Sequence, residues 1–184
     1  DCNATTIHSW SGIGVSNKTE IQIINKINKS KFYKHNWENT EILIIDEISM
    51  MNAELFEKLD IIGQELRKDT RFFGGITLVA SGDFYQLPPV SKMFKARFSF
   101  QSSIWFDVFK NNIILTQNYR QSGDAKYLKM LNQIRVGRIK KSTFKALESR
   151  VIKDSGELDK EDIKPTRLLS LKYKVNKINS KYFN

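Results

Sequence analysis

The chain has 184 residues, of which 40% are hydrophobic, so it is long enough for one packed domain, or for one domain and the beginning of a second. It contains no run of about 18 apolar residues, which argues against a membrane-spanning helix. Its single cysteine, Cys2, excludes an internal disulfide and suits a reducing compartment. The formal net charge of +10 lies mostly in residues 138–184 and favours a polyanionic partner such as nucleic acid, although a lysine- and asparagine-rich genome is an alternative explanation.

The N-terminal residues include side chains that can donate hydrogen bonds to phosphate oxygens: Thr6, His8 and Ser9. Trp10 follows them and offers a surface on which a base can stack. On these residues alone, a structural histidine and a core tryptophan are the favoured interpretation. The pair Gly12 and Gly14 lacks the third glycine and the preceding strand of a dinucleotide-binding loop, so we exclude that function.

Residues 20–34 predict an amphipathic helix with lysines on its outer side. Its buried face is predicted from isoleucines at helical spacing: Ile21, Ile24, Ile27 and, less strictly, Ile23. We expect the aromatic residues that follow to pack into a small core: Phe32, Tyr33 and Trp37.

The apolar run Ile42–Ile45 predicts a β-strand that is buried on both faces, as in parallel sheets covered by helices. Asp46 and Glu47 follow it directly. Because ligands bind at the carboxyl ends of strands in open α/β sheets, this acidic pair is in position to hold Mg²⁺ and to activate a water molecule. The alternative is an ordinary helix start, where acidic residues interact favourably with the helix dipole.

Residues 52–68 predict a crossover helix with Asn52 as its N-cap. Its sheet-facing stripe is predicted from apolar residues at helical spacing: Leu55, Leu59, Ile62 and Leu66. A second buried strand, Ile76–Ala80, follows. The three elements form a predicted βαβ unit, with both strand tips on the same edge of the sheet.

The loop after this second strand contains residues suited to a rigid active-site segment. Gly82 permits a tight turn off the strand, and Pro88 and Pro89 stiffen the exit. Gln86, an uncharged donor and acceptor on this loop, is placed to sense a γ-phosphate or the attacking water.

Residues 91–112 are rich in phenylalanine, and we expect these aromatic side chains to belong mostly to the core. Ile113–Thr116 predicts a third strand, which leads to Arg120. A guanidinium is permanently charged and binds phosphate oxygens in a fork, so Arg120 is a candidate phosphate ligand. The alternative is a surface arginine at a strand end.

The remaining residues predict a helix, a linker and a partial second domain. The helix covers residues 124–138, and residues 139–164 are charged and weakly periodic, which predicts a mobile connection. Residues 165–171 predict a strand, and 175–179 predict the start of the helix that follows it.

Several of these segments resemble motifs of superfamily 1 helicases, in the version found in Pif1-family DNA helicases. Asp46–Met50 resembles their Walker B motif, and Gly82–Val90 resembles their motif III. Leu55–Asp60 and Phe73–Ile76 resemble the signature segment of that family. Thr5–Gly14 resembles motif Ia, and Gln117–Gln121 resembles motif IV.

The resemblance implies an α/β fold: a RecA-like P-loop NTPase motor domain with a mostly parallel sheet flanked by helices, incomplete in this chain and followed by the start of a second motor domain. The implied boundaries are 1–138 for the first motor domain, with a small insertion near 18–39, then 139–164 for the connection and 165–184 for the second motor domain.

The resemblance also implies roles for individual residues. Asp46 is implied as the Mg²⁺ ligand, and Glu47 as the group that activates the attacking water. Gln86 is implied in coupling the phosphate to the DNA, and Arg120 in stabilising charge on the γ-phosphate. The residues implied in contacts with DNA are Thr6, His8, Ser9 and Pro88.

The implied activity is that of a helicase that uses ATP and Mg²⁺ to move 5′ to 3′ along single-stranded DNA and to unwind duplexes in DNA repair, recombination or telomere maintenance. Its expected partners are single-stranded DNA and forked or G-quadruplex DNA. We expect a monomer without a membrane partner, in the nucleus, the mitochondrion or both.

The phosphate-binding sequence Gly-x-x-x-x-Gly-Lys-[Ser/Thr] does not occur in the chain. No segment of the chain resembles motif V or motif VI, and the first residue is Asp1 rather than a methionine. We therefore expect this chain to be the middle of a longer helicase and not to hydrolyse ATP by itself. Two alternatives remain open. One is a degenerate DNA-binding module without ATPase activity, and the other is a different superfamily 1 ATPase, such as a RecD-like or transposon-borne helicase.

Overall fold

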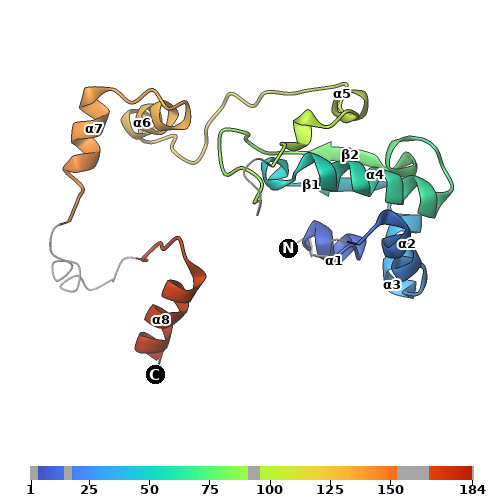
Figure 1. The fold of residues 1–184 in the computed structure, drawn as a ribbon. Coiled ribbons are helices and arrows are strands. Elements are labelled where there is room, and N and C mark those ends of the chain that lie inside the picture. Colours follow the sequence, from blue (N-terminus) through green and yellow to red (C-terminus); the bar gives the residue numbers. More distant parts are fainter. Residues whose placement is uncertain (1–3, 15–17, 91–95, 153–165, 184) are drawn as a thin grey trace. The chain divides into compact units, whose positions relative to one another are not determined.

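The computed structural model describes residues 4–14, 18–90, 96–152 and 166–183 (Figure 1). Its internal contacts divide the chain into two units, residues 1–136 and 137–184. The first unit holds the sheet and the hydrophobic core. The described residues of the second unit contain two helices, α7 (Lys141–Glu148) and α8 (Lys172–Phe183).

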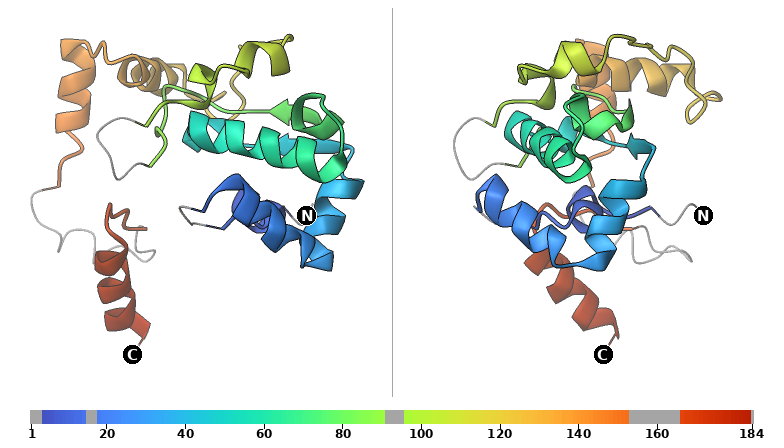
Figure 2. Two further views of the ribbon diagram at one scale, coloured as in Figure 1. Left: turned by 45° about the vertical axis from the view of Figure 1, so that its right-hand side comes forward. Right: turned by 90° about the vertical axis from the view of Figure 1, so that its right-hand side faces the viewer.

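The centre of the first unit is a parallel βαβ arrangement. Strand β1 (Ile42–Ile45) pairs with strand β2 (Thr77–Ala80), with Ile42 opposite Thr77 and Ile45 opposite Ala80. Helix α4 (Ala53–Arg67) connects them and runs alongside the strands in Figures 1 and 2. Asn52 caps α4 by accepting a hydrogen bond of 2.8 Å from the backbone N–H of Leu55. The predicted crossover, cap and strand pair are therefore confirmed.

The core forms around the inner face of α4. The predicted stripe is confirmed, because Leu59, Ile62 and Leu66 are buried and Leu55 is half-buried. Aromatic side chains extend this core from two other segments and pack against Phe56 of α4, with ring centroids 5.1 Å apart for Phe56 and Phe73 and 5.5 Å apart for Phe56 and Trp105. The short helix α5 (Trp105–Val108) supplies Trp105. The described part of the phenylalanine-rich stretch, residues 96–112, therefore does contribute to the core, although Phe106 is exposed, and residues 91–95 lie outside the described residues.

The described residues before the sheet form three further helices: α1 (Ile7–Ser11), α2 (Glu20–Asn28) and α3 (Lys31–Asn39). The single helix predicted over residues 20–34 is wrong, because Ser30 caps a new helix and accepts a hydrogen bond from the backbone N–H of Tyr33. The predicted buried face is also shifted: Ile23 and Ile27 are fully buried, whereas Ile21 is 71% exposed. The helix therefore turns a face centred on Ile23 and Ile27 to the core.

The turn before β2 is held in place by α4. Phe73 and Gly74 have left-handed backbone angles, with φ of 53° and 63°. A Cβ on Gly74 would collide with the carbonyl of Gly63, so only glycine fits there. Asp60 accepts a hydrogen bond of 2.6 Å from the buried backbone N–H of Phe73, and Arg67 donates one of 2.5 Å to the carbonyl of Gly74. The collision with Gly63 explains why the middle residue of the Phe-Gly-Gly sequence is glycine.

The prediction that β1 is buried on both faces is wrong. Leu43 and Ile45 are buried, but Ile42 and Ile44 are 61% and 70% exposed, and β2 alternates in the same way. One face of the two-stranded sheet belongs to the core, and the described residues leave the other face open to solvent.

The third strand predicted at Ile113–Thr116 is also wrong. These residues have no strand pairing, and Ile113, Ile114 and Leu115 are 86–88% exposed. An apolar β-branched run is suited to a sheet, but a strand also needs a neighbour that satisfies its backbone hydrogen bonds. Among the described residues, this run has no such neighbour.

The predictions for the C-terminal residues are partly confirmed. Helix α6 (Ala125–Arg135) lies within the predicted helix, and α8 contains the predicted helix start at 175–179. The described residues of the predicted strand, 166–171, form no strand, and Pro165 lies outside the described residues. Within the predicted connection, Lys141–Glu148 forms α7, and residues 153–164 lie outside the described part of the chain, so the connection stays a prediction.

Candidate functional site

The tips of β1 and β2 meet at one edge of the sheet, because parallel strands end on the same side. Ser81, the first residue after β2, donates a hydrogen bond of 2.5 Å from its hydroxyl to Oδ1 of Asp46, the first residue after β1. The backbone N–H of Ser81 also donates to the carbonyl of Ile45 at 2.9 Å. The acidic pair after β1 is thus joined directly to the loop after β2.

Asp46 is an exposed carboxylate held by two donors. The Ser81 hydroxyl and, to a smaller extent, the backbone N–H of Glu47 keep the pKa of Asp46 below its usual value. The side chain is therefore ionised at neutral pH and retains oxygen lone pairs for a cation. An exposed carboxylate beside a hydroxyl fits the partial ligand set that Mg²⁺ takes when water and phosphate oxygens complete its coordination.

Glu47 has a backbone conformation that is unusual for a residue with a side chain. Its φ of 53° and ψ of 43° lie in the left-handed region, at a cost of about 1–3 kcal/mol. The Ile48–Met50 turn sustains this geometry, because the backbone N–H of Met50 donates to the carbonyl of Glu47 and that of Ile48 donates to the carbonyl of Ser81. Strain of this kind is common at functional sites.

Gly82 has a different role from the predicted one. Its backbone does not adopt a left-handed conformation, so no special turn requires glycine. A Cβ at this position would instead lie 3.0 Å from the backbone nitrogen of Ile48 and 3.2 Å from its Cγ2. The absence of a side chain therefore lets the loop after β2 pass close to the turn that follows Glu47.

A hollow of about 640 Å³ lies beside the carboxylates. Its lining includes Asp46 and Glu47 from the end of β1, and Thr6 and His8 from the N-terminal segment. The structure thus brings together two groups of residues that were predicted to serve different ligands.

The sequence model of the family described as PIF1-like helicase matches residues 2–145 of this chain. The chain belongs to the PIF1-like helicase family. It is 40% identical to the ATP-dependent DNA helicase PIF1 of Saccharomyces cerevisiae over 183 residues, which are 97% of this chain and 21% of the relative. The chain therefore spans about a fifth of the length of this curated relative.

Solved structures of Pif1 helicases have the same fold. The chain aligns with the Pif1 helicase of Candida albicans with a TM-score of 0.84 and 39% identity, over 96% of this chain and 39% of that one. It aligns with Bacteroides Pif1 in complex with ADP-AlF3 and single-stranded DNA with a TM-score of 0.71 and 25% identity, over 97% and 43% of the two chains. The predicted fold class, part of a RecA-like α/β motor domain, is confirmed.

The predicted DNA-contacting residues near the N-terminus also have structural roles in this family member. Thr6 caps α1: its hydroxyl accepts a hydrogen bond from the backbone N–H of Ser9 at 3.2 Å and donates to the Ser9 hydroxyl at 3.0 Å. Trp10 packs against the buried Trp37, with ring centroids 4.7 Å apart, which fits a core tryptophan. His8 is half-buried.

Four predicted site residues do not line the hollow. Ser9, Gln86, Pro88 and Arg120 are exposed, and none of them is among the residues that line it. Arg120 follows the Ile113–Thr116 run, and because that run does not join the sheet, no strand carries Arg120 to the sheet edge. Their roles stay predictions.

Two residues of this region, Asp83 and Arg135, were not predicted as site residues. Asp83 accepts two hydrogen bonds of 2.8 Å from the Nε and Nη2 of Arg135, which lies on α6. Arg135 is the main reason that the pKa of Asp83 falls to about 2. A signal was present for Asp83, an acidic residue after a buried strand, but no sequence pattern pointed to Arg135.

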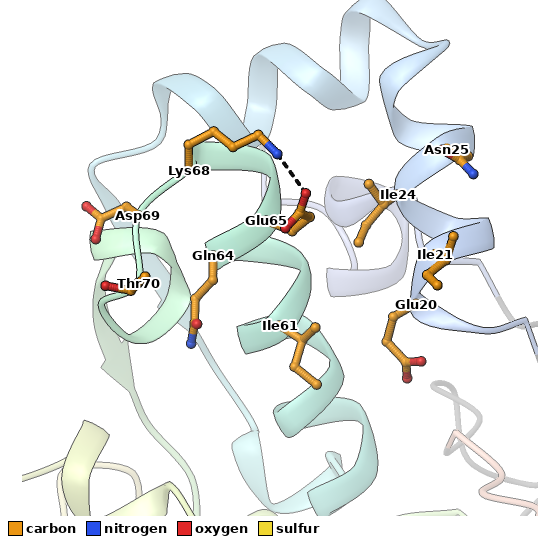
Figure 3. A pocket seen from close by; sticks show the side chains of 10 residues that line it. All are labelled: Glu20, Ile21, Ile24, Asn25, Ile61, Gln64, Glu65, Lys68, Asp69 and Thr70. Atoms are coloured by element: carbon orange, nitrogen blue, oxygen red, sulfur yellow. Dashed lines mark hydrogen bonds and ion pairs between the residues drawn. The ribbon is translucent and has the colours of Figure 1, made fainter.

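A second hollow, of about 650 Å³, lies between α2 and the C-terminal part of α4 (Figure 3). Ile21, Ile24 and Ile61 form its apolar side. Charged groups around it are already paired, as in the ion pair of 2.6 Å between Lys68 and Glu65 that Figure 3 shows. Nothing in its chemistry indicates a ligand.

Among the described residues, no cluster of three or more His, Cys, Asp or Glu side chains is arranged to hold a metal ion. Among the helices of this part of the chain, none has the length and apolar character needed to cross a membrane.

Proposed function

We propose that the whole protein is an ATP-dependent DNA helicase and that this chain carries part of its ATP-hydrolysing edge. The observation that carries the proposal is the hydrogen bond of 2.5 Å between Ser81 and Asp46, which joins the two strand tips next to Glu47. Family membership and the ADP-AlF3 and single-stranded DNA in the Bacteroides Pif1 structure support it. The phosphate-binding loop that such a reaction needs would come from another part of the protein.

Asp46 would hold Mg²⁺, with the Ser81 hydroxyl fixing the orientation of its carboxylate. When bound, the cation neutralises charge on the β- and γ-phosphates. The Ser81 hydroxyl and the backbone N–H of Glu47 both donate hydrogen bonds to Oδ1 of Asp46, so Oδ2 is the oxygen left for a ligand. The lowered pKa of Asp46 ensures that this ligand is charged at neutral pH.

Glu47 would act as the base that orients and activates the attacking water. It lines the same hollow as Asp46, and its carboxylate makes no hydrogen bond to cap the turn that follows. Glu47 follows Asp46 directly in the sequence, but its left-handed backbone does not continue the strand. Two adjacent carboxylates are thereby given separate tasks.

The remaining predicted residues would connect hydrolysis to DNA. We assign Gln86 to the coupling of the phosphate with the DNA side and Arg120 to the γ-phosphate, which requires Arg120 to be carried to the sheet edge in the whole protein. Thr6, His8, Ser9 and Pro88 would contact the single-stranded backbone. Thr6 and Ser9 are both exposed residues, so capping α1 would not prevent such a contact.

The finer features of the proposed function rest on the same family resemblance. We propose movement 5′ to 3′ on single-stranded DNA by a monomer, with forked and G-quadruplex DNA as substrates in repair, recombination or telomere maintenance. The single cysteine agrees with work in a reducing compartment, and we propose the nucleus, the mitochondrion or both.

The test is the substitution Glu47→Gln in the full-length protein. Because it removes the base but keeps the shape, we expect DNA-stimulated ATP turnover to fall by about 10²–10⁴-fold, with nucleotide affinity nearly unchanged. The matched control is Glu41→Gln, the same change on an exposed residue at the opposite end of β1, which should leave turnover unaltered. Near-normal turnover in Glu47→Gln would remove this residue from the mechanism. DNA binding without any ATPase in the wild-type protein would favour the non-hydrolysing module.

A further inference from the structure

The loop that carries Gln86 is tied to α6 by a two-pronged ion pair. Arg135, near the end of α6, donates from Nε to Oδ2 of Asp83 and from Nη2 to Oδ1, both at 2.8 Å. Parallel hydrogen bonds of this type fix the relative orientation of the two groups as well as their distance. The two residues are 52 positions apart in the chain, so the contact joins separate elements.

Asp83 is also the centre of the loop's own hydrogen bonds. It accepts from the backbone N–H of Tyr85 at 3.0 Å and from Nε2 of Gln86 at 3.3 Å. The backbone N–H of Gln86 donates to the carbonyl of Asp83 at 2.9 Å. The orientation of the Gln86 amide is therefore set by the same carboxylate that Arg135 holds.

Arg135 makes one more contact with this loop. Its guanidinium carbon lies 4.5 Å from the centroid of the Tyr85 ring, a cation–π distance. On the other side of the loop, Phe84 packs into the core against Phe100, with centroids 4.8 Å apart. The loop is thus anchored by Phe84 to the body of the first unit and by Asp83 to α6.

The attachment of α6 is unlike that of α4. None of the residues of α6 is buried, so packing does little to fix this helix. Arg135 is also the second-last residue before the boundary between the two units, which falls between residues 136 and 137. The ion pair is partly exposed, and such pairs contribute little to stability. Its position, between the loop after β2 and the end of the first unit, favours a role in coupling.

We propose that Arg135 is a positioning residue that, through Asp83, holds Gln86 in its working orientation and couples the loop after β2 to the segment that leads into the second unit. This inference rests on the proposed function, because the working orientation matters only if ATP is hydrolysed. Arg135 touches neither nucleotide nor DNA in this role.

The experiment uses the full-length protein with Arg135→Gln and Arg135→Lys, and measures kcat and KM for ATP at saturating single-stranded DNA. We expect Arg135→Gln to lower kcat between about tenfold and about 100-fold, while KM stays within about twofold, because a misplaced group impairs the reaction more than binding. Arg135→Lys keeps the charge but cannot form the fork, and should lie between Arg135→Gln and wild type. The double variant Asp83→Arg, Arg135→Asp reverses the pair and should recover part of the lost kcat.

The matched control is Lys129→Gln, which removes a charge from an exposed residue of the same helix and should behave as wild type. A melting temperature for every variant separates coupling from misfolding; if Arg135→Gln unfolds, Arg135→Lys decides the question. If Arg135→Lys and Arg135→Gln both fold and both keep the wild-type kcat, the inference is overturned and the proposed function is left intact. A wild-type protein without ATPase activity overturns both.

Discussion

The stability of the first unit is expected to depend on Asp60, a carboxylate on α4 that is only 5% exposed. Its Oδ1 accepts a hydrogen bond of 2.6 Å from the backbone N–H of Phe73, a fully buried residue with a left-handed backbone. Its Oδ2 accepts from Nε2 of Gln64 at 2.8 Å. Asp60→Ala would leave the buried backbone N–H of Phe73 without this acceptor, while the packing of Phe73 against Phe56 would remain.

The magnitude follows from these contacts. An unsatisfied buried N–H costs about 1–3 kcal/mol, and a hydrogen bond to a charged group contributes about 1.5–3 kcal/mol. These figures overlap, and removing a buried charge offsets part of them, so we expect Asp60→Ala to lower the free energy of unfolding by about 2–4 kcal/mol. Asp60→Asn keeps an acceptor for Phe73 and should cost about half as much, since charge-assisted hydrogen bonds are about twice as strong as neutral ones.

The assay is urea unfolding of the 184-residue chain, followed by tryptophan fluorescence, because Trp37 and Trp105 are buried in this unit. Glu65→Ala is the control: it lies on the same helix and pairs only with Lys68 at the surface, so it should change the free energy by less than about 0.5 kcal/mol. If Asp60→Ala were no more destabilising than Glu65→Ala, the role given to Asp60 would be wrong.

Two further predictions concern the loop after β2. Gly82→Ala should lower the free energy of unfolding by about 1–3 kcal/mol and reduce ATP turnover, because the added Cβ would lie 3.0 Å from the backbone nitrogen of Ile48. The control in the same urea titrations is Gly123→Ala, where the added Cβ would meet no atom within 4 Å. The pKa of Asp83 is lowered to about 2 from 3.8, so the unfolded chain binds this proton more readily. The stabilisation by the Asp83–Arg135 pair should therefore be complete above about pH 4 and lost towards about pH 2, and the difference in urea midpoint between wild type and Asp83→Asn should shrink over that range; a constant difference would contradict the pairing.

The elements that the sequence determined by itself are those that depend on local signals. Helix α4 has its apolar stripe and its Asn52 cap within one segment, so both its position and its buried side were predictable. The placement of Asp46 and the Ser81 loop on one edge followed from two apolar strands joined by one helix, since parallel strands must end on the same side. The motifs around these strand tips also sufficed to predict the family.

Tertiary structure alone decided which apolar residues find partners. Periodicity measures how well a segment suits burial, but Ile44 and the Ile113–Thr116 run are exposed because no described element covers or pairs with them. The same holds for Arg135 and Asp83, whose contact depends on the path of the chain over 52 positions. Sequence patterns describe neighbours along the chain, whereas the covering of a sheet face and the pairing of distant charges depend on neighbours in space.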